Sequence, residues 1–403
     1  MTTRRSFLAL SGGVLAASAL AACREPEASA APPVAAVPDV LLAGSRGGLV
    51  RSTGTDTRVL GAHAALSRDG AIAYSTDGDF VVRLDAATGA PLQKEEIGGG
   101  WVPRVVAESG NACVLTTFEP AEPPAPRATT ALLVTGPGGP RKFELTGCIE
   151  PDAFTADGQG LFVLDWLPAD KPDHYRVRML DFADGKTYPL FTRDKQPVPA
   201  GAEEQMRGRG RQAVYSRERQ TLYTLYTHQP GHQHTRNLIS GTKAEVHAFV
   251  HVLHLAERWA YCLDLPDPFG HGPAAGHALA VDRQHIAVLE TTSGTLLYAG
   301  AETMEIERVA RVPAAAGPAS LALGGDRRVF AADGTTVHVL DRSTDTALAA
   351  WSLPSAARGL ALSRDGSRLY AGGTDEAVWL DTAAGSLAGR ARVEGLTEVL
   401  SVH

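Results

Sequence analysis

The sequence predicts an all-β protein, a β-propeller made of four-stranded blades. From residue 39 onward the chain repeats a unit of about 40–50 residues, a period typical of propeller blades. Within the units, Asp-Gly pairs separate short apolar runs. This is a hairpin signal, because glycine accepts the positive φ that a tight turn demands. Although 403 residues would suggest two or three domains, the repeat predicts one domain over residues 39–403.

Composition places the chain among globular proteins. It is 44% hydrophobic and 21% charged, which excludes disorder throughout and a collagen-like structure. The net charge of −7 supplies no basic field to hold a nucleic acid. We therefore expect no nucleic-acid partner.

The first 22 residues are expected to be an export signal. Residues 3–8, TRRSFL, precede an apolar run over residues 9–22, which is shorter than the roughly 20 residues of a transmembrane helix. Arg4 and Arg5 lie in a segment that resembles the twin-arginine signal of exported folded proteins. Residues 20–23, LAAC, resemble a bacterial lipobox, which implies that Cys23 is lipidated.

Residues 23–38 are expected to be a tether after the lipidated cysteine. They are rich in alanine and proline and lack aromatic side chains, so they cannot bury enough apolar surface to order themselves. The signal and tether together imply a membrane-anchored lipoprotein at the outer face of the bacterial cytoplasmic membrane or in the periplasm. We expect a monomer.

Seven blades can be read in order along the chain. Residues 64–97 and 360–393 match each other best, each with a Ser-Arg-Asp-Gly turn after its first strand and a Leu-Asp end to its third. The other five units are looser matches, and they cover residues 102–147, 152–191, 212–266, 277–312 and 320–353.

The two ends of the repeat region are expected to share an eighth blade. Residues 39–61 supply three strands, and residues 397–403, TEVLSVH, supply one. Their pairing would close the ring and remove sheet edges that promote aggregation. The count is therefore eight blades, or seven if the terminal pieces belong to neighbouring blades.

Two turn motifs resemble those of the YVTN-type and TolB-like bacterial propellers. Residues 362–370, LSRDGSRLY, match their Ser-x-Asp-Gly turn before a Leu-Tyr strand, and residues 85–89, DAATG, match their later turn. The resemblance implies the fold and not the function, since such propellers include enzymes, sensors and scaffolds.

One end of the propeller is expected to carry the function. With the strands of a blade named a to d from the centre outward, the long insertions are all b–c loops or d–a connections, which share one face. Loops gathered at one end of a rigid scaffold are where binding usually occurs; alternatively, exposed insertions are simply tolerated. The insertions are residues 119–130, 167–175, 192–211, 228–247 and 266–277.

Histidines in the longest insertion form the sharpest cluster. His228, His232 and His234 could together bind copper, zinc or nickel, although their spacing matches no established site. Alternatively they are solvated loop residues. A bound transition metal is thus the one cofactor that the sequence suggests.

Five arginines and one histidine are candidates for a ligand-binding face. Guanidinium groups around one end of the ring could bind an anion through bidentate hydrogen bonds. The alternative is that these arginines form salt bridges with carboxylates of the protein itself. The candidates are Arg104, Arg207, Arg209, Arg211, Arg358 and His277.

Three cysteines remain once Cys23 is lipidated, so at most one disulfide can form within the chain. Cys113 and Cys148 flank one blade and are the expected pair. Three buried thiols, with Cys262 as the third, are the equal alternative.

Two function classes follow. The chain lacks a Gly-x-Ser-x-Gly elbow, a His-Glu-x-x-His pair and a phosphate loop. This favours a non-enzymatic module that presents its loop-rich face to an envelope protein or a small ligand. The alternative is an extracytoplasmic enzyme, lactonase-like or a metal-assisted hydrolase, that uses the His- and Arg-rich face.

Overall fold

The computed structural model describes residues 34–207, 211–244, 246–313 and 316–403. Contacts divide the chain into Met1–Ala31 and Pro32–His403, and all described residues belong to the second unit. Arg4, Arg5, Cys23 and Arg209 lie outside the described residues. Among the described residues, no helix has the length and apolar character needed to cross a membrane.

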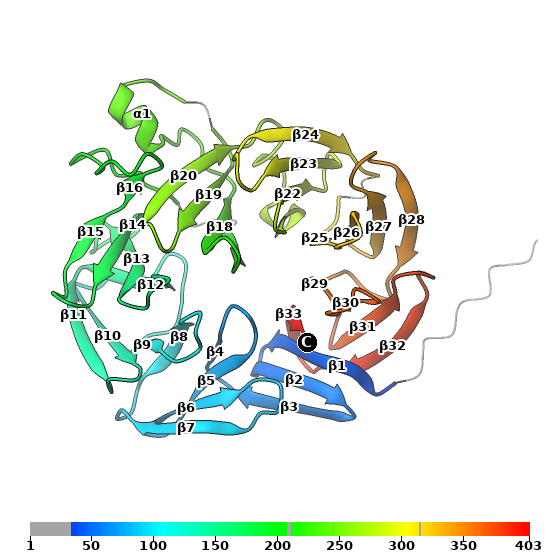
Figure 1. Ribbon diagram of the computed structural model, residues 1–403, viewed down its shortest axis with the longest axis horizontal. Helices are drawn as coiled ribbons and strands as arrows, with labels where there is room; N and C mark the ends of the chain where they lie inside the picture. Colours follow the sequence, from blue (N-terminus) through cyan, green and yellow to red (C-terminus); the bar gives the residue numbers. More distant parts are fainter. Residues whose placement is uncertain (1–33, 208–210, 245, 314–315) are drawn as a thin grey trace, which may run out of the picture. The chain divides into compact units, whose positions relative to one another are not determined.

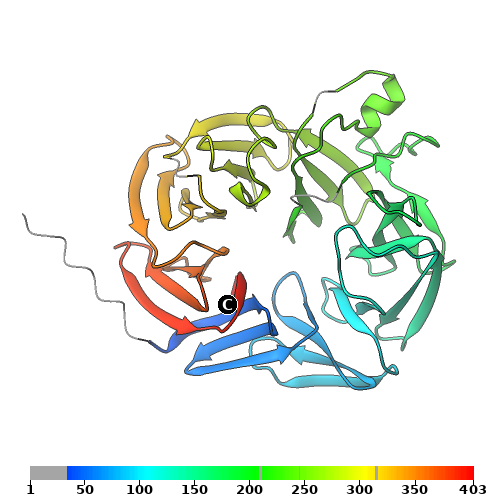
Figure 2. The ribbon, with the colours of Figure 1, turned by 180° about the vertical axis from the view of Figure 1, so that it is seen from behind.

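In the part of the chain that the structure describes, eight sheets follow one another around a ring, and they are antiparallel except for one short edge strand (Figures 1 and 2). The predicted all-β class and the count of eight blades are confirmed, and the alternative of seven blades is wrong.

Seven blades are built from consecutive strands. The first three of these are β4 (Ala64–Leu66), β5 (Ile72–Asp77), β6 (Phe80–Asp85) and β7 (Pro91–Glu96); β8 (Val102–Val106), β9 (Cys113–Thr116), β10 (Thr129–Thr135) and β11 (Arg141–Thr146); and β12 (Cys148–Phe154), β13 (Gly160–Leu167), β14 (His174–Asp181) and β15 (Thr187–Pro189).

The remaining four consecutive blades follow the same plan. They are β17 (Gln212–Ser216), β18 (Thr221–Tyr226), β19 (Phe249–His254) and β20 (Trp259–Asp264); β21 (His277–Val281), β22 (His285–Glu290), β23 (Thr295–Gly300) and β24 (Ile306–Arg311); β25 (Ala319–Leu323), β26 (Arg328–Asp333), β27 (Thr336–Asp341) and β28 (Ala347–Ser352); and β29 (Leu360–Leu362), β30 (Arg368–Gly372), β31 (Glu376–Asp381) and β32 (Leu387–Arg392).

The eighth blade joins the two ends of the repeat region. Its strands are ordered β3 (Asp56–Gly61), β2 (Gly48–Gly54), β1 (Val37–Ser45) and β33 (Leu396–Val402). The last strand pairs antiparallel with β1, with Leu41 opposite Val402 and Ser45 opposite Leu396. The predicted closure by the terminal strands is therefore confirmed.

The Ser-x-Asp-Gly turn has a local physical cause. In the last consecutive blade, Asp365 accepts hydrogen bonds from the Ser363 hydroxyl at 2.6 Å and the Ser367 backbone N–H at 3.0 Å. Gly366 follows with φ of +70°, a conformation that glycine adopts without a Cβ penalty. The turn is therefore stabilised by hydrogen bonds among its own residues and needs no contact from elsewhere in the chain.

Blade β17–β20 departs from the four-stranded plan at its outer edge. The short strand β16 (Phe191–Thr192) adds parallel to β20, with Phe191 opposite Trp259. Helix α1 (Thr235–Ser240) lies in the insertion between β18 and β19, at the periphery of the ring (Figure 1). Both additions come from insertions that the sequence places on the long-loop face. The 310 helix η1 (Ala274–Gly276) precedes β21.

The predicted Cys113–Cys148 disulfide is wrong, because both thiols are free and buried, as is that of Cys262. Cys113 packs with Tyr74 and Leu115, whereas Cys148 belongs to the core shared by blades β12–β15 and β17–β20. A third interblade core separates these two. The alternative of three buried thiols is the one that the structure bears out.

Candidate functional site

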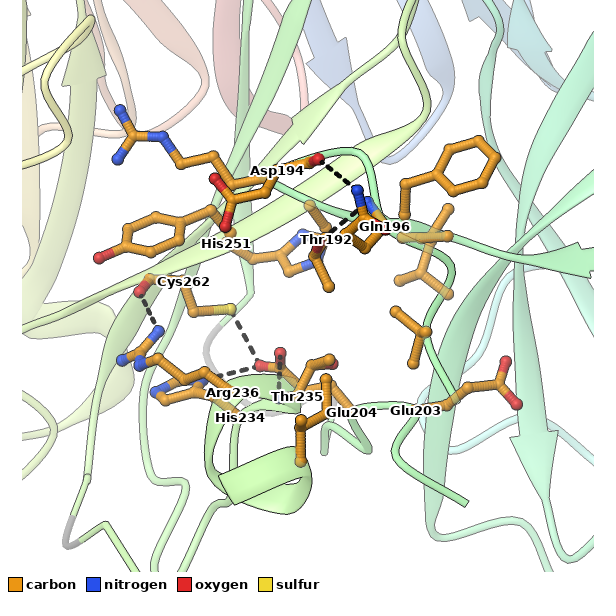
Figure 3. Close-up of a pocket in the computed structure, with 18 of the residues that line it drawn as sticks. Thr192, Asp194, Gln196, Glu203, Glu204, His234, Thr235, Arg236, His251 and Cys262 are labelled. Carbon is orange, nitrogen blue, oxygen red and sulfur yellow. Dashed lines mark hydrogen bonds and ion pairs between the residues drawn. The ribbon is translucent and has the colours of Figure 1, made fainter. Parts of the chain in front are cut away.

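A cavity of about 660 Å³ opens at the outer edge of blade β17–β20, and we call it the rim cavity (Figure 3). It lies between the segment 190–206, helix α1 and strand β20. One part of its wall is apolar and includes Val177, Leu190, Val198, Met206 and Ile239. The other part carries charged and polar side chains, among them Arg193, Asp194, Glu203, Glu204, His234, Arg236 and Cys262.

Three side chains of this polar wall converge, and His232 lies directly beside them. The Glu204 Oε1 atom lies 2.7 Å from His232 Nε2, 2.9 Å from His234 Nδ1 and 2.9 Å from Cys262 Sγ. The two imidazole nitrogens are 3.2 Å apart. Glu204, His232, His234 and Cys262 are hereafter the Glu204 cluster, three members of which Figure 3 labels.

The cluster draws on three segments of the chain. Cys262 projects from β20, and His234 is the N-cap residue of α1, two residues after His232. Glu204 lies two residues before Met206, which forms a β-bridge with Tyr175 of β14. The cluster therefore depends on two insertions that meet at the outer strand β20.

Aromatic packing fixes the two imidazole rings. The His232 ring stacks on Phe249 with centroids 4.3 Å apart, and His234 meets the same phenyl ring edge-on at 5.1 Å. The side chains of His232 and His234 are 2% and 1% exposed. These histidines are thus held by the core and do not sample the solvent.

Asp264 and Arg236 contact the side of the His234 ring that faces away from Glu204. Its Nε2 atom lies 2.5 Å from Asp264 Oδ1, and Arg236 Nη2 donates to Asp264 Oδ2 at 2.6 Å. Arg236 Nη1 also donates to the carbonyl oxygen of Cys262 at 2.8 Å. This chain of polar contacts fixes the orientation of the His234 imidazole relative to Glu204.

The electrostatics of the cluster follow from burial and proximity. Burial raises the pKa of Glu204, but hydrogen bonds from His232 and His234 outweigh it and hold that pKa well below its ordinary value. Burial lowers the pKa of His234, but hydrogen bonds to Asp264 and Glu204 outweigh it and raise that pKa. The two opposite shifts have one cause, since the charged forms of the carboxylate and the imidazole stabilise each other.

Cys262 is not set up as a nucleophile. Burial and the neighbouring Glu204 carboxylate raise the pKa of its thiol well above the ordinary value. The thiol accordingly keeps its proton and donates it toward Glu204.

Of the three histidines that the sequence groups together, the structure unites His232 and His234 only. His228 adopts a left-handed backbone with φ of +57°, and its Nδ1 atom lies 2.8 Å from the Thr227 hydroxyl. Its ring faces His277 instead, with centroids 6.3 Å apart.

His277 is a buried structural residue in this arrangement. Its Nε2 atom accepts the Gly270 N–H at 3.0 Å, and Nδ1 donates to the Pro273 carbonyl oxygen at 3.0 Å. Burial lowers its pKa and keeps the ring neutral. Both ring nitrogens are therefore used within the protein.

Two of the predicted ligand-face arginines are tied to carboxylates. Arg104 Nη2 lies 3.4 Å from Glu150 Oε2, and both side chains are buried. Arg211 forms an ion pair with Asp152. For these two, the structure matches the salt-bridging alternative.

The other arginines have different surroundings. Arg358 Nη1 donates to the carbonyl oxygen of Leu396 at 2.9 Å, which ties it to the closing strand. Arg207 is exposed and lines a second hollow together with His232 and Gln229.

Sequence reasoning missed Glu204, Asp264 and Cys262 as site residues. Cys262 and Asp264 are two residues apart in β20, a spacing that places side chains on the same face of a strand. That spacing is the one signal in the sequence that could have paired them. No local pattern connects either residue to Glu204 or His234.

Comparison with known proteins identifies a fold and no family. No family model and no curated protein matches the chain. Among solved structures, the dihydro-heme d1 dehydrogenase NirN in complex with DHE is similar at 13% identity and a TM-score of 0.51, covering 93% of this chain and 76% of that chain. The computationally designed Ika8 protein is 15% identical with a TM-score of 0.48, covering 92% of this chain and 93% of that chain. The first likeness is one of propeller fold alone.

Proposed function

We propose that this chain is an exported, lipid-anchored propeller of the bacterial cell envelope that acts as a binding module for a small ligand. The rim cavity carries the proposal. It has the size of a small-molecule site, an apolar wall and a set of convergent polar groups, which is the usual composition of such sites. The ligand it fits has an apolar body and a polar or charged end.

The arrangement favours binding over the enzyme alternative. That alternative relies on His and Arg side chains gathered on the long-loop face. Arg104, Arg211 and His277 are instead bonded within the protein, and the Cys262 thiol retains its proton.

Binding in the rim cavity can be tested with anilinonaphthalene sulfonate, which has an apolar aromatic body and one anionic group. Ala260 of β20 lines the cavity, so Ala260→Trp fills it. Leu348→Trp is the matched control, because Leu348 is an exposed residue on β28, an outer strand of another blade. We expect saturable fluorescence enhancement with the purified full chain and with the control, and its loss in Ala260→Trp at an unchanged melting temperature. Equal enhancement in both variants would contradict the proposed site.

Export and anchoring have separate tests. Arg4→Lys with Arg5→Lys should block translocation, because the twin-arginine pathway reads guanidinium pairs and not charge alone. Cys23→Ala should abolish labelling by a fatty-acid probe. Normal envelope levels of the double lysine variant, or continued labelling of the alanine variant, would show the lipoprotein assignment to be incorrect.

A further inference from the structure

The Glu204 cluster brings together the donor atoms that a transition metal ion requires. One ligand atom each from Glu204, His234 and Cys262 lies within 4.8 Å of the other two. A tetrahedral ion with bonds of about 2.0–2.3 Å has its ligand atoms within roughly 4 Å of one another. His232 Nε2 lies 2.7 Å from Glu204 Oε1 and 3.2 Å from His234 Nδ1, beside two of the three donors.

We propose that the Glu204 cluster holds a zinc ion, with Glu204, His234 and Cys262 as its ligands. This inference deepens the proposed function, since three protein ligands leave the fourth position of a tetrahedral ion open to the polar end of a ligand in the rim cavity.

The cluster converges on one carboxylate oxygen. Glu204 Oε1 lies within hydrogen-bond distance of His232 Nε2, His234 Nδ1 and Cys262 Sγ. A metal ion would replace the hydrogen bonds from His234 and Cys262, because a carboxylate, an imidazole and a thiolate each offer it an electron pair.

The types of donor select the ion. A thiolate and imidazoles favour zinc and other transition ions, whereas calcium and magnesium prefer sites made of oxygen alone. On binding, the Cys262 thiol loses its proton to solvent, as does any imidazole nitrogen that coordinates the ion while it carries one, and the thiolate sulfur binds the metal.

The surroundings of His234 match those of a metal-bound histidine. With Nδ1 turned toward the cluster, Nε2 lies 2.5 Å from Asp264, which in turn is held by Arg236. Metal-ligating histidines usually donate their second N–H to a carboxylate, which fixes the ring and strengthens the ligand. Loss of such an outer partner typically weakens metal binding by about 10–100-fold.

The test is metal loading of the full chain purified in detergent. After incubation with zinc and desalting, elemental mass spectrometry should find one zinc per chain. Cobalt(II) in its place should give the near-ultraviolet absorption of a cobalt–thiolate bond. Cys262→Ala should abolish that absorption and Glu204→Gln, which keeps the side chain's shape, should abolish stoichiometric zinc. Asp264→Asn should weaken zinc binding about 10–100-fold.

Matched controls isolate the cluster. Cys113→Ala removes a buried thiol elsewhere and His63→Ala removes an exposed imidazole, so both should retain zinc and, with cobalt, the thiolate band. Circular dichroism of each variant separates loss of ligand from loss of fold. A wild-type chain that holds no zinc or cobalt after loading, or a Cys262→Ala variant with an unchanged cobalt spectrum, would overturn the zinc site. Dye binding in the rim cavity is measured separately, so that result would leave the binding proposal standing.

Discussion

Asp39 and Arg368 form a bidentate ion pair across the closure of the ring, with Nε to Oδ2 at 2.7 Å and Nη2 to Oδ1 at 2.9 Å. Tyr370 adds a third bond by donating its hydroxyl to Asp39 Oδ2 at 2.7 Å. Asp39 belongs to β1, whereas Arg368 and Tyr370 belong to β30 of the last consecutive blade. The pair therefore joins the two ends of the repeat region by side chains, next to the backbone pairing of β1 with β33 (Figure 1).

Removing the charge of Asp39 should weaken the closure. Asp39→Asn is expected to lower the free energy of unfolding by about 1.5–3 kcal/mol, the usual contribution of a hydrogen bond to a charged group. Chemical denaturation with circular dichroism measures it. Asp77→Asn is the matched control, because Asp77 pairs with Lys94 on the exposed surface and its loss should change stability little. If the two substitutions lowered the free energy of unfolding equally, the Asp39–Arg368 ion pair would have no special role in closing the ring.

The same pair predicts a pH dependence with a definite sign. The hydrogen bond from Arg368 lowers the pKa of Asp39 below its ordinary value of 3.8. Because the folded state binds the proton more weakly than the unfolded chain, the stabilisation is fully present above about pH 4 and is lost as the pH falls through the lowered pKa. The difference in unfolding free energy between wild type and Asp39→Asn should therefore shrink below pH 4. A difference that stays constant down to pH 2 would contradict this assignment.

The closing strand offers an internal comparison of buried and exposed leucines. Leu396 is 1% exposed and packs with Val399 and Val402, whereas Leu400 is 44% exposed. Leu396→Ala should lower the free energy of unfolding by about 2–5 kcal/mol through lost burial and a residual cavity. Leu400→Ala should change it by no more than about 0.5 kcal/mol. Thermal and denaturant melts of the two variants give the comparison, and equal shifts would count against the observed register of β33 on β1.

The fold could be predicted from the sequence because its signals are local. The turn at Asp365 and Gly366 is fixed by neighbouring atoms, so it is readable wherever it recurs. The eighth blade could be predicted by counting strands. The N-terminal end of the repeat region has three strands and the C-terminal end has one, and together they make the four strands of a complete blade.

The candidate site could not be predicted to the same extent. The sequence motif grouped His228 with His232 and His234. It did not reveal that His228 has a left-handed backbone and turns away from the other two histidines. Glu204 reaches the cluster in a segment that is anchored by the β-bridge between Met206 and Tyr175, a tertiary contact outside the blade repeat. The disulfide prediction failed for a related reason, since proximity in sequence did not reveal that Cys113 and Cys148 face different interblade cores.

Thiol chemistry checks the cysteine assignment directly. Cys113, Cys148 and Cys262 are free and buried, so the folded body of the protein should resist alkylation. In denaturant without reductant, all three thiols should react, as counted by mass spectrometry of the labelled peptides. Cys113→Ala should reduce the count by one. A cross-linked peptide joining Cys113 to Cys148 would contradict the prediction.

The last prediction concerns the buried Glu150 carboxylate and its two guanidinium partners, Arg104 and the half-buried Arg127. Arg104 Nη2 lies 3.4 Å from Glu150 Oε2, and Arg127 Nη2 lies 3.5 Å from Glu150 Oε1. Burial raises the pKa of Glu150, because desolvation outweighs the attraction of the two guanidinium groups. A buried group of paired charges adds little net stability, because the cost of removing the charges from water offsets their attraction. Each charge nevertheless needs its partners, since a buried charge without a counter-charge is strongly destabilising. Glu150→Gln keeps the shape and leaves the buried Arg104 and the half-buried Arg127 without this counter-charge, so it should lower the free energy of unfolding by about 3–5 kcal/mol. Replacing all three residues together, by Glu150→Leu, Arg104→Met and Arg127→Met, should recover most of that loss, since no buried charge then remains. Denaturant unfolding of the single and triple variants decides the point: a triple variant less stable than Glu150→Gln would mean that the three charges together stabilise the fold.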